Sequence, residues 1–334
     1  ERRIMFNLVG PVWEGNQVWL ITAGGAIFAA WPALYAASFS GFYLAMMLLL
    51  VALILRPVGF KYRSKYENTP WRNTWDGVVT FTGVVAPVVF GVAFGNVILG
   101  VPFAVEPDTL RPLYHGSFWA LFSTFALLCG VLSLLMLVTH GAAILAWRVV
   151  NPVAERARKL GVFSALLVAI VFALGGVWVA NLDGHVITSV MDTAGPSNPL
   201  NKAVVLEQGA WLANFDRWGW MWAAPGLGVL AAVGVSLLLL MRRPVLAFFA
   251  SALSIAGIIL TVGFALFPFI LPSSANPNIG LTAWDASSSH LTLWVMLIAT
   301  VIFLPIVLSY TSYVYYIMRG KVSEKSLGET PNSY

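Results

Sequence analysis

Polar and charged positions divide the chain into long apolar runs joined by short polar segments. The first run extends from Gln17 to Leu55 and contains no charged residue over 39 positions. At a rise of about 1.5 Å per residue, one helix of this length would extend about 58 Å, roughly twice the hydrocarbon core of a bilayer. Pro32 lies near the middle of the run and disfavours a continuous helix. We therefore expect two spans, about Val12–Trp31 and Ala33–Leu55, that meet in a tight turn at the membrane interface.

Six further runs are long enough to cross a bilayer, because each has about 20 or more predominantly apolar residues. They are Trp75–Val101, Phe118–Trp147, Leu160–Leu182, Trp220–Met241, Val245–Ile270 and Leu291–Met318. The expected fold class is all-α: a polytopic transmembrane helical bundle with eight spans in this chain. Residues 1–318 are expected to form a single transmembrane helical domain, and residues 319–334 a short polar tail.

The composition fits a membrane protein and argues against other classes. The chain has 334 residues, of which 59% are hydrophobic and only 10% are charged, whereas soluble domains carry about 25% charged residues. Its net charge of +5 does not indicate nucleic-acid binding, because the basic residues lie between the apolar runs. The one cysteine, Cys129, lies inside an apolar run, so no disulfide framework is expected.

The distribution of Lys and Arg predicts how the spans are oriented. If the amino terminus lies inside and the spans alternate, the outer segments contain only Arg111, Lys202 and Arg217 of the 19 basic residues. Such an excess of positive charge on one side marks the cytoplasmic face of a membrane protein. The carboxyl-terminal tail is therefore expected to be cytoplasmic. The outer loops are the longer ones, above all Asp183–Gly219 and Pro272–Ser289, and long loops often carry functional or interaction surfaces.

Glu14 is the first candidate for chemistry, because a carboxylate at the edge of a span is costly unless it is paired or hydrated. Gln17 lies three residues further on, on the same helical face. This pair could hold water or pass protons, or Glu14 could be an interfacial residue that extends towards solvent. Trp19 lies inside the span, where an indole usually packs between helices. Arg56 could bind an anionic headgroup, pair with an acid, or serve only as an orientation signal.

The histidines do not form a haem or metal site. A transmembrane b-type haem normally needs His or Met ligands aimed at one buried iron, and no pair of histidines lies at mid-membrane. His140 is expected to be an interhelical residue with a hydrogen-bond partner rather than a ligand. No metal-ligand spacing, phosphate-binding glycine loop or nucleophile motif stands out. The residues alone therefore leave two readings open, a transporter and a subunit of a larger complex.

Several motifs in order along the chain resemble one known family, subunit II of the cytochrome bd quinol oxidases of bacterial respiratory chains. WEGNQVWLITAGG and LTAWDASSSHLTL are the most specific of them. The others include ERRIMFN, RPVGFKYRSK, WRNTWD and SNPLNK at 197–202. The resemblance implies a multi-pass protein of the bacterial inner membrane with nine spans in the full subunit, so that this chain would lack the first transmembrane helix.

The resemblance also implies an activity and partners. The complex would be a terminal oxidase of aerobic respiration that oxidises quinol, reduces oxygen to water and generates proton motive force. Subunit I would be the main partner, with membrane lipid around the complex and, in some members, a small accessory single-helix subunit. Haem b558, haem b595 and haem d would be ligated by subunit I, and some members bind a quinone in subunit II.

Site residues follow from the matched motifs. Glu14, with Gln17 beside it, corresponds to a proton pathway, at a position where the family often has Asp. Trp19 corresponds to an oxygen route or the subunit interface. Arg56 lies in the RPVGF motif and is a candidate for a quinone, lipid or structural role. No catalytic residue and no metal ligand is expected in this chain itself.

Overall fold

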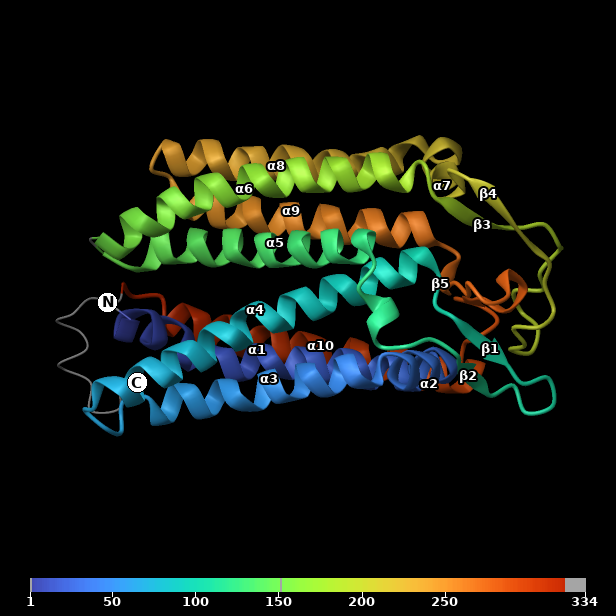
Figure 1. The fold of residues 1–334 in the computed structure, drawn as a ribbon, viewed down its shortest axis with the longest axis horizontal. Helices are drawn as coiled ribbons and strands as arrows, with labels where there is room; N and C mark the ends of the chain where they lie inside the picture. Colours follow the sequence, from blue (N-terminus) through green and yellow to red (C-terminus); the bar gives the residue numbers. More distant parts are fainter. Residues whose placement is uncertain (1, 151, 322–334) are drawn as a thin grey trace.

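Long α-helices that run side by side dominate the structure, a computed structural model that describes residues 2–150 and 152–321 (Figure 1). Two short helices, α2 (Pro32–Gly41) and α7 (Ala213–Arg217), lie near one end of the bundle. The long helices are α1 (Arg2–Ala30), α3 (Tyr43–Tyr62), α4 (Thr69–Leu99), α5 (Thr124–Arg148), α6 (Pro152–Val179), α8 (Ala223–Leu240), α9 (Pro244–Leu266) and α10 (His290–Ile317).

Seven helices in the described residues are long and apolar enough to cross a membrane, namely α3, α4, α5, α6, α8 with the turn before it, α9 and α10. The expected all-α transmembrane bundle is confirmed at this level. The remaining long helix, α1, has 29 residues, but Glu14, Asn16 and Gln17 make its middle polar. It therefore does not belong to that group of seven.

The first predicted pair of spans needs a correction. A break does occur at Trp31, between α1 and α2, as Pro32 predicts. The prediction of one helix over Ala33–Leu55 is wrong, because α2 ends at Gly41 and α3 begins at Tyr43. Gly41 lies so close to Tyr114 that an added Cβ would be 2.7 Å from its ring. α2 thus packs closely against Tyr114 at the point where the helix ends.

The predicted span ends also differ from the helix ends. α3 continues through Pro57 to Tyr62, and α1 begins at Arg2 rather than near Val12. Hydropathy marks the apolar part of a helix, whereas the backbone hydrogen bonds continue into the polar flanks. As a result, Glu14 lies well inside a helix and not at its start.

Three small antiparallel hairpins cover one end of the bundle. β1 (Phe103–Val105) pairs with β2 (Pro112–Tyr114), β3 (Asp183–Ile187) with β4 (Val204–Gln208), and β5 (Phe269–Leu271) with β6 (Leu281–Thr282). We call the segments that carry β1–β6 the cap; they include both long loops that the sequence analysis placed outside. The opposite end, which we call the basic end, carries the α3–α4, α5–α6 and α8–α9 turns and both ends of the described chain (Figure 1).

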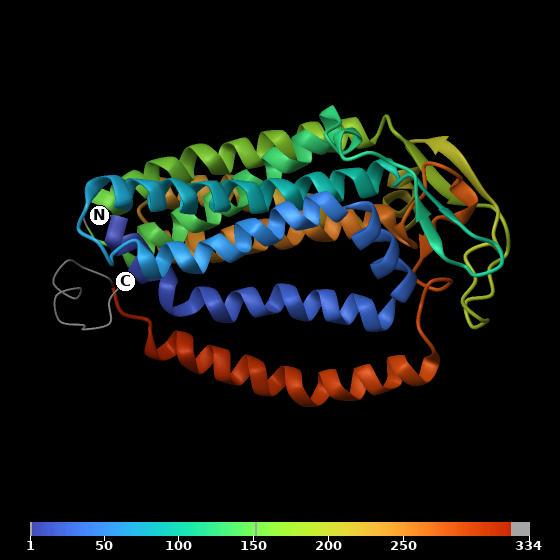
Figure 2. The ribbon, with the colours of Figure 1, turned by 60° about the horizontal axis from the view of Figure 1, so that its bottom comes forward.

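Packing is close in the centre of the bundle and loose at one edge. An added Cβ at Gly91 on α4 would lie 2.2 Å from the carbonyl oxygen of Cys129, so the backbones of α4 and α5 nearly touch. By contrast, no side chain of α10 is buried. Figure 2 shows α10 (red) at the edge of the molecule, with α1 (dark blue) between it and the other helices. A large part of α1 and α10 is thus open to lipid or to a partner.

Candidate functional site

The polar residues of α1 lie on a helix that is only partly covered. Glu14 is exposed, and Gln17, one turn further on, is half-buried. Within the described part of the chain, Gln17 Oε1 is buried and has no hydrogen-bond partner. Asn16 Oδ1 accepts a hydrogen bond of 3.0 Å from the Tyr315 hydroxyl, which links α1 to α10. A buried carbonyl oxygen without a donor usually indicates a missing water or partner group.

Trp19 and Arg56 do not contact this polar group through any hydrogen bond among the described residues. Trp19 is 38% exposed on α1, so its indole is available to a surface outside the chain. Arg56 is half-buried on α3 and donates from Nη2 to the Thr82 carbonyl oxygen of α4 at 3.2 Å. That bond joins α3 to α4 and satisfies a carbonyl close to Pro87, the proline inside α4.

A cluster at the basic end was not predicted as a unit. Asp76 on α4 receives two hydrogen bonds from Arg63, of 2.5 and 3.1 Å, and pairs with Arg2 Nη1 at 2.6 Å. Arg63 also lies over the Phe6 ring, 5.2 Å from its centroid. A groove of about 710 Å³ opens beside this cluster. Arg2, Arg63 and Asp76 come from three of the motifs quoted above, and only the fold brings them together.

A second pairing that sequence reasoning missed lies inside the cap. Lys202 Nζ contacts Asp285 Oδ2 at 2.6 Å, and the two side chains are 1% and 7% exposed. Lys202 also donates to the Pro199 carbonyl oxygen, and Asp285 Oδ1 accepts from the Thr282 backbone N–H. Lys202 ends the SNPLNK motif and Asp285 lies in LTAWDASSSHLTL. The two motifs were notable in the sequence, but nothing local indicated that they meet.

Burial changes the acid–base behaviour of two cap residues. Desolvation lowers the pKa of Lys202, and its hydrogen bond and charge interaction with Asp285 offset this effect only in part. Desolvation also lowers the pKa of His185, although the 3.1 Å contact between its Nε2 and the Ser273 carbonyl oxygen favours the protonated ring. His185 stacks on Trp211 and meets Phe269 edge to face. The neutral imidazole is therefore the favoured form inside the cap.

The remaining histidine of interest is a packing residue, as the sequence analysis expected. His140 on α5 lies 2.8 Å from the Ser251 hydroxyl of α9 and packs against Phe248. The described residues contain no group of three or more His, Cys, Asp and Glu side chains that could hold a metal ion. His140 is half-buried and His185 is buried, and one ring nitrogen of each contacts an oxygen of Ser251 or Ser273, respectively.

Comparisons with known proteins agree with the motifs. A family model described as cytochrome bd terminal oxidase subunit II matches residues 1–318. The chain is 50% identical over 334 residues to cytochrome bd-I ubiquinol oxidase subunit 2 of Escherichia coli (strain K12), covering 100% of this chain and 88% of that protein. It is 48% identical over 333 residues to the probable cytochrome oxidase subunit 2 of Haemophilus influenzae, with coverage of 100% and 88%.

The fold is similar to that of a solved oxidase. A chain in the structure of bd oxidase from Geobacillus thermodenitrificans superposes with a TM-score of 0.68 at 18% sequence identity. The match covers 95% of this chain and 86% of that chain. At this level of identity the likeness concerns the fold alone.

Proposed function

The chain belongs to the cytochrome bd terminal oxidase subunit II family, and from that premise we propose that it assists proton and oxygen access in a quinol oxidase. As a family member it is a subunit of an oxidoreductase complex, and its partner is subunit I. In that complex, quinol would be oxidised and oxygen reduced to water. Proton motive force would arise because protons are released on one side and consumed from the other.

The proposed membrane arrangement uses all eight long helices. α1 would be the eighth span, since its 29 residues exceed the roughly 20 that a bilayer requires. Its polar middle would face subunit I or water rather than lipid. The basic end, with the carboxyl terminus, would lie on the cytoplasmic side of the bacterial inner membrane, because Lys and Arg concentrate there. Residues 322–334, most of the expected tail, lie outside the described residues.

The haems b558, b595 and d are assigned to subunit I in this proposal. When bound there, they carry electrons from quinol to oxygen. The present chain contributes packing and access instead, which is supported by the hydrogen-bonded state of His140 and His185. For Arg56 we favour the structural role, since its guanidinium already binds a carbonyl of α4. A quinone or membrane lipid bound to this subunit, and an accessory subunit, remain proposals from the family alone.

The proton role depends on one observation: an exposed carboxylate lies one helical turn from a buried, unpartnered carbonyl oxygen. Glu14 can take up a proton from water, and Gln17 Oε1 is an acceptor that can order a water molecule next to it. Together, the two side chains form a polar pair on an otherwise apolar face of α1. We propose that this pair relays protons into the complex, where they are consumed in oxygen reduction.

Trp19 is proposed to line the oxygen route or the contact with subunit I. Its ring is partly exposed on the same helix as Glu14, and the surface around it is apolar, with Val18, Leu20 and Ile21 at 53%, 45% and 71% exposure. Such a surface stabilises a helix–helix contact and also admits a small apolar gas.

The test compares three variants of Glu14 in the assembled complex. Glu14→Gln keeps the size of the side chain but cannot carry a proton, so we expect quinol oxidase turnover to fall by roughly tenfold or more. Glu14→Asp keeps the acid and should retain most of the turnover. Glu14→Ala should resemble Glu14→Gln. Oxygen consumption is measured with quinol in excess, and haem absorption spectra report the assembly.

A matched control removes an exposed carboxylate elsewhere in the chain. Glu67 is an exposed carboxylate in the α3–α4 turn, and Glu67→Gln should leave turnover unchanged. Full turnover of Glu14→Gln with normal haem content would refute the relay and leave the subunit with a purely structural role. Loss of haem content in Glu14→Gln would assign the residue to assembly instead.

A further inference from the structure

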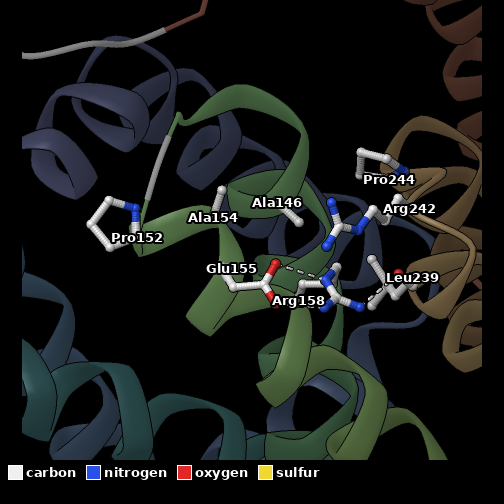
Figure 3. A pocket seen from close by; sticks show the side chains of 8 residues that line it. All are labelled: Ala146, Pro152, Ala154, Glu155, Arg158, Leu239, Arg242 and Pro244. Carbon is white, nitrogen blue, oxygen red and sulfur yellow. Dashed lines mark hydrogen bonds and ion pairs between the residues drawn. The ribbon is translucent and has the colours of Figure 1, made fainter.

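An open pocket at the basic end belongs to neither the α1 polar group nor the cap. It lies between the end of α5, the start of α6 and the α8–α9 turn, and encloses about 590 Å³ (Figure 3). Its charged side chains are Glu155 and Arg158 from α6 and Arg242 from the α8–α9 turn. Leu239 and Pro244 supply part of its apolar wall. The pocket is therefore an amphipathic cavity at the level where the helices leave the bundle.

One of the two arginines is held in place by partners inside the pocket. Arg158 makes two hydrogen bonds to Glu155, of 3.0 Å from Nε and 2.5 Å from Nη2. Its Nη1 points to the Leu239 carbonyl oxygen at 3.4 Å. The guanidinium is thus fixed against α8, with 19% of the side chain exposed. A ligand would meet a preorganised cation there.

The second arginine has no such partners. Among the described residues, no hydrogen bond restrains the guanidinium of Arg242, which has a charge interaction with Glu155. With two arginines and one glutamate, the pocket keeps a surplus of positive charge. Figure 3 shows the side chains of Arg242 and Arg158 extending into the same space from different elements. This arrangement suits an anion with several oxygen atoms.

The backbone of Arg242 forms the end of α8. Its φ is +57°, in the left-handed region that glycine adopts most easily. Its N–H donates to the Leu239 carbonyl oxygen and the Arg243 N–H to that of Leu238, which is the pattern of a Schellman helix end. The residue that ends α8 is thus an arginine that also lines the pocket, at a position where glycine would be less strained.

Apolar surface continues from the pocket along the outside of the bundle. Leu240 and Met241 are 58% and 60% exposed at the end of α8, and Leu246 and Phe249 are 49% and 56% exposed on α9. A free inorganic anion would not contact this apolar surface, whereas the acyl chain of a lipid would cover it. We propose that the pocket binds the phosphate group of an anionic membrane phospholipid, with Arg242 and Arg158 on the phosphate and the acyl chains along α8 and α9.

The experiment measures lipid retention by the intact oxidase complex. The complex is purified from membranes, delipidated and reconstituted in phosphatidylcholine nanodiscs with increasing phosphatidylglycerol, and native mass spectrometry counts the bound phosphatidylglycerol. We expect Arg242→Gln to need at least about tenfold more phosphatidylglycerol for half-maximal binding, because a charge-assisted hydrogen bond is lost. Arg243→Gln is the matched control, since it removes the same charge one residue away, outside the pocket lining. It should change binding by less than about twofold.

Arg242→Gly separates binding from folding. Glycine suits the positive φ, so this variant should unfold at the same temperature as the wild type or higher, yet lose the lipid as Arg242→Gln does. Equal losses in Arg242→Gln and Arg243→Gln, or no loss in either, would overturn the proposal. If inorganic phosphate alone stabilised the complex in phosphatidylcholine nanodiscs, with no further effect of phosphatidylglycerol, the pocket would belong to the free ion and the lipid assignment would be wrong.

Discussion

At the scale of single residues, buried polar atoms in the cap and on α1 differ in whether they have a partner. Lys202 has a carboxylate partner, and His185 contacts a carbonyl oxygen through Nε2. Among the described residues, His185 Nδ1 in the cap and Gln17 Oε1 on α1 have no hydrogen-bond partner. Satisfied polar groups stabilise the isolated fold, whereas unsatisfied ones indicate where water or another molecule belongs.

The stability of the cap should depend on pH through His185. Burial lowers its folded-state pKa below the ordinary value of 6.5, so the unfolded cap binds a proton more readily than the folded cap. The contribution of the neutral ring is fully present above pH 6.5 and is lost as the pH falls below that value. Each unit of pKa difference costs about 1.4 kcal/mol. The protection factors of the β3 and β4 amides, which correct hydrogen–deuterium exchange for its intrinsic slowing at lower pH, should therefore decrease as the pH falls below 6.5.

The control for this effect is the exposed His290 at the start of α10. His290→Gln should leave the pH dependence of exchange unchanged, while His185→Gln should reduce it. If the protection factors in the His185→Gln variant fell at low pH as much as in the wild type, another group would be responsible.

At the scale of elements, small residues decide how closely neighbouring helices approach. Gly91 lets α4 lie against the backbone of α5, since an added Cβ would meet the Cys129 carbonyl oxygen. Gly83, two turns earlier on the same helix, has no atom within 4 Å of the position of an added Cβ. Gly24 and Gly25 on α1 are equally open. The sequence does not distinguish these glycines, because a glycine that contacts a neighbouring helix and one that faces lipid are the same letter in it.

A pair of substitutions tests this difference. Gly91→Ala should force α4 and α5 apart and lower the free energy of unfolding by about 1–3 kcal/mol. Gly83→Ala should leave it unchanged or raise it slightly, because alanine is the better helix former and meets no neighbour. Thermal unfolding of the purified complex measures both. Equal melting temperatures for the two variants would contradict the close approach of α4 and α5.

At the scale of the whole molecule, the cap joins segments that are far apart in the chain. Lys202 precedes β4, and Asp285 lies between β6 and α10. The same loop holds the α1–α2 junction, because Trp31 Nε1 donates to the Ala283 carbonyl oxygen at 3.1 Å and the Ser288 N–H donates to the Ala30 carbonyl oxygen at 2.7 Å. The cap therefore sets the position of α1, and with it Glu14, relative to the bundle.

Breaking the ion pair should loosen this assembly. Lys202→Met and Asp285→Asn should each destabilise the subunit by about 3–5 kcal/mol, because each leaves a buried group without its partner. The double variant Lys202→Met/Asp285→Asn should cost less than the sum of the two single changes. Arg217→Met, at an exposed cation of the same cap, should change stability by no more than about 0.5 kcal/mol. Additive losses in the double variant would mean that the two side chains do not act as a pair.

The sequence by itself determined that this protein is a helical membrane bundle, and it located Glu14, Gln17, Trp19 and Arg56 as candidates. Long apolar runs are sufficient for the first conclusion, because a chain in lipid must satisfy its backbone hydrogen bonds internally and a helix does so within one segment. The candidates followed from the motifs in which they lie. The break at Trp31 followed from one proline, which acts locally.

Only the tertiary structure decided which distant residues meet. Lys202 and Asp285 are separated by 83 positions, and Arg2 and Asp76 by 74. No periodicity of one segment can encode such pairs, because they depend on how helices and loops from different parts of the chain pack. The second break, before α3, lies beside another long-range contact, between Gly41 and Tyr114. Local physics thus determined the helices of this chain, and long-range packing determined its cap, its ion pairs and its pockets.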